Sequence, residues 1–103
     1  MNKKRQHPDD RRYQILTAAI AIAERPGGYS KLTRKVIADE IGIAEATISL
    51  YFGTMPAFRR TIMRSAVMTE NLAIVVQGIA VGDAHALKAP ADLKLRALQS
   101  LVE

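Results

Sequence analysis

Apolar residues along this chain recur at three- and four-residue spacings, and glycine and proline divide the pattern into short segments. Such spacing gathers apolar side chains on one face of a helix, whereas a half-buried strand alternates apolar and polar residues. The chain contains no alternating stretch, no internal repeat and no low-complexity segment. The pattern therefore predicts an all-α fold of about five or six helices around one modest core.

The first helix is expected over residues 9–24, where the apolar residues share one face. Asp9 or Asp10 is placed to cap its N-terminus. Pro26 cannot continue a helix, and the two glycines that follow it supply turn geometry. The first helix is therefore expected to end before Pro26.

Two short helices are expected next, over residues 34–41 and 45–52. Thr33 is placed to cap the first of them, and Gly42 is placed to end it in a left-handed conformation that only glycine adopts without strain. The inward residues of this pair are expected to be Val36, Ile37, Ala38, Ile41, Ile43, Ile48 and Phe52.

A longer helix is expected after Thr54, which can cap it, with Pro56 in the first turn. The apolar stripe of this long helix is expected to comprise Phe58, Ile62, Ala66, Thr69, Ala73 and Val76. A last short helix follows the interruptions "VGDAH" and "KAP", and its apolar residues are Leu95, Leu98 and Val102.

Two short helices joined by a tight glycine turn are typical of a helix-turn-helix, which presents its second helix for insertion into the major groove of DNA. A purely structural pair of helices shares the same apolar pattern. If the motif reads DNA, the exposed side of its second helix carries Glu45, Ala46, Thr47, Ser49, Leu50 and Tyr51.

These residue types suggest particular contacts with DNA. Thr47 and Leu50 can meet thymine methyl groups, and the hydroxyl of Thr47 or Ser49 can bond a base edge or a phosphate. Tyr51 suits a phosphate. Glu45 can accept a hydrogen bond from cytosine N4, or it can serve as a favourable charge at the helix N-terminus.

Positive charge is concentrated in the N-terminal part of the chain. Residues 1–64 contain 12 Lys/Arg and 6 Asp/Glu, whereas residues 65–103 contain 3 and 4. This asymmetry indicates an end that binds a polyanion and an end that packs, although ordinary solvated surface charge gives similar counts. Four residues at a helix start are also expected to contact DNA: Lys31, Thr33, Arg34 and Lys35. A basic arm that enters the minor groove is expected at Lys3, Lys4 and Arg5.

The residues that carry this argument also resemble the DNA-binding domain of the tetracycline-repressor (TetR) family of bacterial transcription regulators. The resemblance covers about residues 10–60. It is carried by Arg12, Ile15, Leu16, Ala18 and Ala19 upstream, and by Thr33, Ile37-Ala38, Gly42-Ile43, Thr47-Ile48 and Tyr51-Phe52 within the two short helices. The resemblance implies a three-helix DNA-binding domain in a transcription regulator.

Three positions depart from the family pattern. Ala44 stands where the family has a capping Ser, Ser49 where it has a phosphate-contacting Tyr, and Met55 where it has a Lys. Members of the family are also considerably longer, with a large C-terminal ligand-binding domain. We therefore expect no small-molecule inducer for this chain.

The C-terminal part of the chain includes "LAIVVQGIAV", residues 72–81, which is apolar around most of a helix. Such a helix needs more cover than a small monomer readily supplies, which predicts a homodimer; the alternative is that the last helix covers it within one chain. The expected interface residues are Leu72, Val75, Val76, Ile79, Leu95 and Leu98. The expected organisation is an arm (1–8), a helix-turn-helix domain (9–60) and a helical dimerisation region (61–103).

Several classes of function receive no support from the sequence. The chain has no cysteine, and its two histidines, His7 and His85, lack nearby ligand partners, so we expect no metal site and no cofactor. We find no catalytic assembly, no membrane span and no signal peptide, and expect a cytoplasmic protein. The sequence favours a homodimeric transcription regulator that binds specific double-stranded DNA. The alternatives are a protein-interaction adaptor and a DNA-packaging or replication accessory protein.

Overall fold

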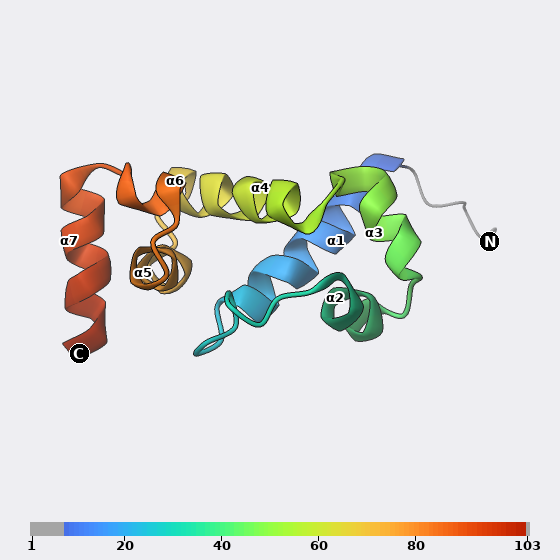
Figure 1. Ribbon diagram of the computed structural model, residues 1–103, viewed down its shortest axis with the longest axis horizontal. Coiled ribbons are helices and arrows are strands. Elements are labelled where there is room, and N and C mark those ends of the chain that lie inside the picture. The colour runs from blue at the N-terminus through green and yellow to red at the C-terminus, as the bar shows by residue number, and fades with distance from the viewer. Residues whose placement is uncertain (1–7, 103) are drawn as a thin grey trace, which may run out of the picture.

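The computed structural model describes residues 8–102 of the chain. In that range the protein is all-α, as the sequence predicts, and contains no strand (Figure 1). The described residues form seven α-helices, slightly more than the five or six expected. The elements are α1 (Pro8–Ala23), α2 (Arg34–Ile41), α3 (Glu45–Phe52), α4 (Met55–Met68), α5 (Leu72–Ala80), α6 (Ala84–Leu87), α7 (Ala91–Gln99) and a final 3-10 turn, η1 (Ser100–Val102).

The helices form two groups joined by α4. Helices α1, α2 and α3 lie together at one end of the molecule, and α5, α6 and α7 lie at the other, with α4 running between them (Figure 1). Helix α4 contacts α1 and α3 at one end and α5 and α6 at the other. The position of α3 therefore depends on the same helix that supports the C-terminal group.

Local signals determine the boundaries of the short helices as predicted. The Thr33 hydroxyl accepts a hydrogen bond from the Val36 amide at 3.1 Å, and the Thr54 hydroxyl accepts one from the Ala57 amide at 3.2 Å. Gly42 ends α2 in the left-handed conformation, with φ 71° and ψ 40°. Helix α1, in contrast, begins at Pro8, so Asp9 and Asp10 lie within its first turn and neither precedes the helix as a cap.

The single long helix predicted after Thr54 is wrong. The chain breaks after Met68: Glu70 adopts a positive φ of 56°, and the Asn71 side chain accepts a hydrogen bond from the Ile74 amide to start α5. Because the break redirects the chain, Thr69 and Ala73 are exposed and do not continue the buried stripe.

One hydrophobic core runs through both groups of helices. At the α3 end, Phe52 stacks on Phe58 of α4 with ring centroids 4.1 Å apart, and Ile48 is fully buried beside them. Ile37 and Ala38 of α2 are buried as predicted, but Val36 is 39% exposed, so its expected inward position is wrong. Ile41 and Ile43 are half-buried at the edge of this core.

The C-terminal group covers α5 within one chain. Helix α5 packs between α4 and α7, and Ile74 and Val75 are fully buried. Helix α7 buries Leu93 and Ala97, so the predicted inward set of Leu95, Leu98 and Val102 instead points to the surface, the last with 85% of its area exposed. The sequence predicts the wrong face of α7 because Leu95, Leu98 and Val102 are also regularly spaced on the outer side of α7 and η1.

This arrangement predicts the effect of charge on α5. Val75→Asp places a carboxylate in the core without a partner and is expected to lower the free energy of unfolding by about 3 kcal/mol or more. Val81→Asp is the matched control, because Val81 follows α5 directly and is 56% exposed, and it should cost no more than about 1 kcal/mol. Thermal unfolding followed by circular dichroism measures both, and equal losses would contradict the intrachain burial of α5.

Candidate nucleic-acid interface

Helix α3 lies at the surface, at the end of the molecule opposite α7 (Figure 1). It follows α2 after the Gly42 turn and contacts it directly. Its inner residues, Ile48 and Phe52, are buried. Its first residue is preceded by Ala44, which provides no side-chain hydrogen bond, so the N-terminal amides of α3 lack a side-chain cap.

The outward surface of α3 has a central exposed face with half-buried residues on either side of it. Ala46 and Leu50 are four residues apart, so they share the outermost face, and Leu50 is 81% exposed. Thr47 and Ser49 lie on the two sides of this face and are half-buried. Of the other two residues of α3 predicted to contact DNA, Glu45 is exposed and Tyr51 is half-buried against the core.

Arg34 of α2 lies against one edge of α3. Its guanidinium donates a hydrogen bond to the Ser49 hydroxyl at 2.7 Å. The sequence predicted both residues as DNA contacts, but from separate positions. The structure brings them together, so a phosphate at this edge would meet a fixed cation and a hydroxyl side by side.

Arg12 of α1 lies at the other end of α3 and was not predicted as a contact. Its guanidinium donates a hydrogen bond to the Tyr51 carbonyl at 3.0 Å and lies 4.4 Å from the centre of the Phe52 ring. A cation at the C-terminal carbonyls of a helix is favourable for the helix dipole, and the ring contact adds a cation–π interaction. Arg12 is nevertheless exposed. Two guanidinium groups from other helices therefore contact α3, that of Arg34 near its middle and that of Arg12 at its C-terminal end.

The other basic candidates are less closely tied to α3. Lys35 forms an ion pair with Asp39 at 3.0 Å, and this hydrogen bond and the carboxylate charge raise the Lys35 pKa. Lys31 is exposed in the segment before α2. The Thr33 hydroxyl is engaged as the cap of α2. The predicted arm residues Lys3, Lys4 and Arg5 lie outside the described residues.

A polar network holds the segment between α1 and α2, and sequence reasoning missed it. Arg59 of α4 donates hydrogen bonds to the carbonyls of Tyr29 and Leu32 at 2.5 and 2.6 Å. Gln77 of α5 donates to the Ala23 carbonyl at 2.6 Å and accepts from the Tyr29 amide at 2.9 Å. This segment leads directly into the start of α2, so side chains from α4 and α5 position the cations expected near DNA.

Tyr29 is the centre of that network. The side chain is 2% exposed, and its phenol donates a hydrogen bond to the Asp83 carboxylate at 2.9 Å. Asp83 also caps α6 by accepting from the amides of His85 and Ala86. The only sequence signal was a tyrosine after a glycine pair, and no local pattern relates it to an aspartate more than fifty positions later.

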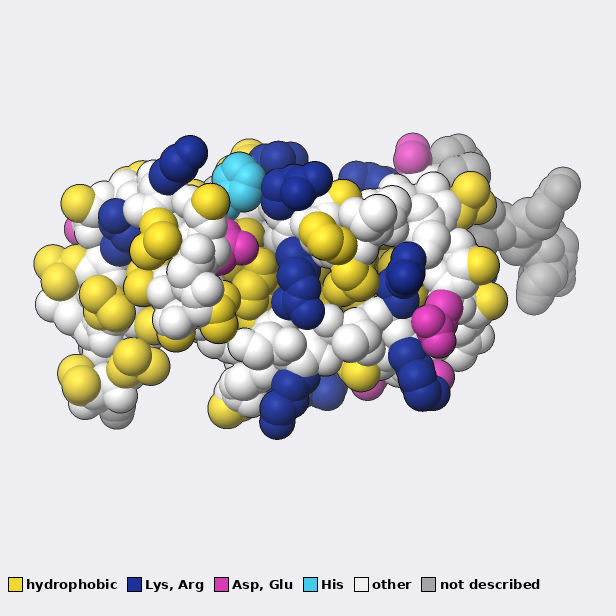
Figure 2. Space-filling view, viewed as in Figure 1, with side chains coloured by type: hydrophobic (Ala, Val, Ile, Leu, Met, Phe, Trp, Pro, Cys, Tyr) yellow, Lys and Arg dark blue, Asp and Glu magenta, His cyan; other side chains and the backbone are white. Residues whose placement is uncertain are grey.

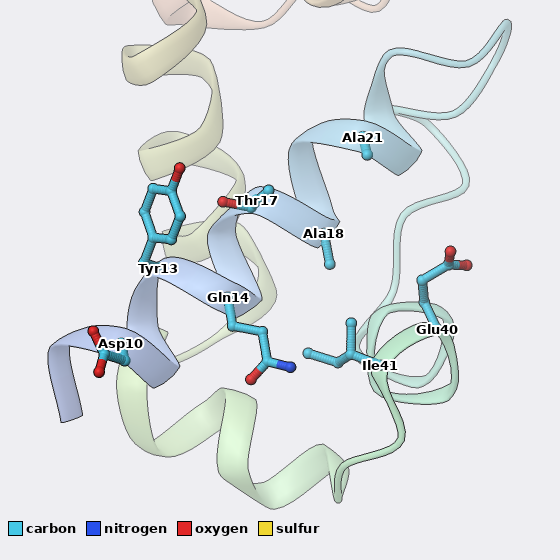
Figure 3. Close-up of a pocket in the computed structure, with 8 residues that line it drawn as sticks. All are labelled: Asp10, Tyr13, Gln14, Thr17, Ala18, Ala21, Glu40 and Ile41. Atoms are coloured by element: carbon cyan, nitrogen blue, oxygen red, sulfur yellow. The ribbon is translucent and has the colours of Figure 1, made fainter. Parts of the chain in front are cut away.

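An open groove of about 640 Å³ runs between the outer faces of α1 and α2 (Figure 3). Small and apolar side chains, including Ala18 and Ile41, form part of its wall, and Tyr13 stands at one side with 72% of its area exposed. Two carboxylates, Asp10 and Glu40, also line it. The groove is distinct from the exposed centre of α3.

The predicted dimer residues are mostly inside one chain. Val75 and Val76 are buried within the chain, which corrects their expected place in a dimer interface, and Leu72 and Ile79 are half-buried against the core. Leu95 and Leu98 are exposed, at 55% and 46%. Hydrophobic side chains gather on the visible face at the α7 end of the molecule (Figure 2).

Other kinds of site find no support in residues 8–102. Within that range, no three His, Cys, Asp or Glu side chains are grouped closely enough to hold a metal ion. None of the described helices is long and apolar enough to cross a membrane. Comparisons with protein-family models, with curated proteins and with solved structures give no match. The TetR resemblance therefore stays a prediction.

The Tyr29 network predicts how stability depends on pH. Burial, followed by the hydrogen bond to Asp83, raises the Tyr29 pKa above its usual value. Above about pH 10 the unfolded chain releases the phenolic proton while the folded protein keeps it, so Tyr29 makes stability fall by about 1.4 kcal/mol per pH unit.

Tyr29→Phe should remove that part of the alkaline loss, and should cost about 1.5–3 kcal/mol at neutral pH because the bond to a carboxylate disappears. Urea unfolding at several pH values from 7 to 11 measures both effects. Tyr13→Phe is the control, because Tyr13 is largely exposed. An alkaline loss in Tyr29→Phe equal to that of the unmodified chain would contradict the role of Tyr29.

Proposed function

We propose that this protein is a transcription regulator that binds specific double-stranded DNA through α3. The observation that carries the proposal is the pair of guanidinium groups placed against α3 from two other helices, Arg34 at one edge and Arg12 at the C-terminal end. Cations at the margin and at the end of a groove-inserted helix are placed to contact phosphates. The exposed face of α3 that carries Ala46 and Leu50 is then free to meet base edges.

The charge distribution supports the same proposal. The excess of Lys and Arg belongs to residues 1–64, whereas residues 65–103 are nearly neutral. Within residues 1–64 it comes from the first seven residues and from Arg59, Arg60 and Arg64 of α4, because basic and acidic residues are equal in number between residues 8 and 54. A cationic end attracts DNA and orients the protein before close contact forms. The resemblance of residues 10–60 to the TetR DNA-binding domain points to the same use of α3.

Salt dependence tests the proposal directly. Each phosphate contact adds about 0.9 to the slope of log binding constant against log salt concentration. Arg34→Ala should weaken binding to duplex DNA and reduce the magnitude of that slope by about 0.9, the value of one phosphate contact. Lys88→Ala is the matched control for loss of one positive charge, because Lys88 is exposed beyond α6, and its slope should equal that of the unmodified protein.

Arg34→Lys separates charge from geometry. It keeps the cation and should preserve most of the slope, although it loses the planar group that bonds the Ser49 hydroxyl. Fluorescence anisotropy with labelled duplexes measures the binding constants. An unmodified protein whose affinity for DNA is absent or insensitive to salt would contradict the proposed function.

The second candidate function is a protein-interaction adaptor, and the groove between α1 and α2 favours it. Small and apolar side chains and two carboxylates line this groove, which suits a segment of a partner protein that presents apolar and basic residues. Salt-insensitive or absent DNA binding, together with tight binding of such a segment, would support the adaptor instead.

We further propose that the regulator is a homodimer joined through α7 and η1. Their outward face carries Leu95, Leu98, Leu101 and Val102, which are all substantially exposed. Four neighbouring apolar side chains on a short terminal element form a patch that a second copy can cover with the same surface. A two-fold dimer that reads two half-sites must place its α3 helices one DNA turn, about 34 Å, or a multiple of it apart.

Leu98→Asp should separate the dimer, because it places a carboxylate in the middle of that patch. Leu87→Asp is the control, since Leu87 is also about half exposed but lies on α6. Sedimentation at micromolar concentration distinguishes a dimer from an 11.3 kDa monomer. A monomeric unmodified protein that binds DNA at full affinity would rule out the dimer without affecting the proposed role of α3.

A further inference from the structure

The surface of α3 lacks the side chains that recognise purines by paired hydrogen bonds. Residues 43–53 contain no Arg, Lys, Asn or Gln. Arg and Lys bond the O6 and N7 atoms of guanine, and Asn and Gln bond the N6 and N7 atoms of adenine. The exposed centre of α3 therefore has no group able to read a purine edge in this way.

Beyond Glu45 at its first position, the side chains that α3 exposes are apolar. Leu50 has 81% of its area exposed, and Ala46 is exposed four residues before it on the same face. The nearby hydroxyls occupy the edges of the face, and Ser49 already accepts a hydrogen bond from Arg34. The part of the helix that would enter a groove most deeply thus carries a methyl group and an isobutyl group.

The thymine C5-methyl is the apolar group that the four standard bases present in the major groove. We propose that Leu50 and Ala46 determine sequence specificity by packing against thymine methyl groups. This inference rests on the proposed DNA-binding function, and it names the chemical feature of the site that α3 reads. Cytosine lacks this methyl, so the two pyrimidines differ at the contact.

The spacing of the two side chains sets the spacing of the thymines. Residues four apart on a helix have Cβ atoms about 5–6 Å apart, and base pairs along DNA are stacked about 3.4 Å apart. The two contacts therefore fall on neighbouring or next-neighbouring base pairs. Arg34 and Arg12 lie at the margin and at the end of this face, where phosphates are reached more readily than base edges.

The experiment removes single methyl groups from DNA. Duplexes are first selected by the full-length protein from a random-sequence library, and the selected duplex is then synthesised with each thymine replaced in turn by deoxyuridine. This replacement removes the methyl and keeps every hydrogen-bonding group. At one or two neighbouring positions, the dissociation constant should rise about fourfold per methyl removed.

Leu50→Ala identifies the protein side of the contact. The variant should bind the thymine duplex more weakly and should lose its sensitivity to deoxyuridine at the position that Leu50 meets. Leu87→Ala removes an exposed leucine from α6 and should keep the full sensitivity of the unmodified protein. Placing 5-methylcytosine for cytosine in a duplex with cytosine at that position should restore affinity for the unmodified protein alone.

The outcomes separate the two levels of the proposal. Salt-dependent, site-specific binding with no effect of deoxyuridine at any position would overturn methyl recognition and leave the DNA-binding function standing. Equal deoxyuridine sensitivity in Leu50→Ala and the unmodified protein would overturn the assignment to Leu50. Absence of any DNA binding would overturn both the function and this inference.

Discussion

The rest of the site depends on the hydrogen bonds that Arg59 donates to the segment before α2. This segment has little regular structure, so its backbone carbonyls need partners from elsewhere. Arg59 of α4 donates hydrogen bonds to the carbonyls of Tyr29 and Leu32, and Gln77 of α5 donates one to the carbonyl of Arg25. Because these donors come from helices that are packed in the core, the segment takes its position from the tertiary fold.

A continuous set of contacts then leads from the C-terminal group to α3. Asp83 starts α6 and bonds Tyr29, the Tyr29 segment enters α2 at Thr33, and Arg34 in the first turn of α2 bonds Ser49 of α3. Helix α4 supports the other side of α3 through the stacked pair of Phe52 and Phe58. The outer face of α3 is therefore oriented by contacts on both of its sides, which is the condition for reading base edges in a fixed register.

The sequence predicts those parts of the fold that local chemistry decides. Thr33, Gly42 and Thr54 act within a few residues of themselves, and the helix boundaries they predict are confirmed. The break near Glu70 was missed because the apolar spacing continues through it, and only the Asn71 cap marks it. The outward side of α7 was missed for a related reason: spacing shows that residues share a face, but the packing of α5 decides which face is covered.

In the candidate site, too, the sequence predicts what the helix period decides and misses what the tertiary fold decides. The exposure of Leu50 and Ala46 follows from the period of a short helix whose inner side is Ile48 and Phe52, so the sequence alone identifies it. The placement of Arg12 beside the Tyr51 carbonyl depends on where the tertiary fold puts α1 relative to α3, which the residue spacing within either helix cannot show.

The surroundings of the exposed leucines also differ between the two ends of the molecule. Leu50 follows Ser49, whose hydroxyl accepts a hydrogen bond from the Arg34 guanidinium, whereas Leu98 lies in the nearly neutral region of residues 65–103. An apolar group among cations suits a polyanion that carries methyl groups, and an apolar cluster without excess charge suits a second copy of itself.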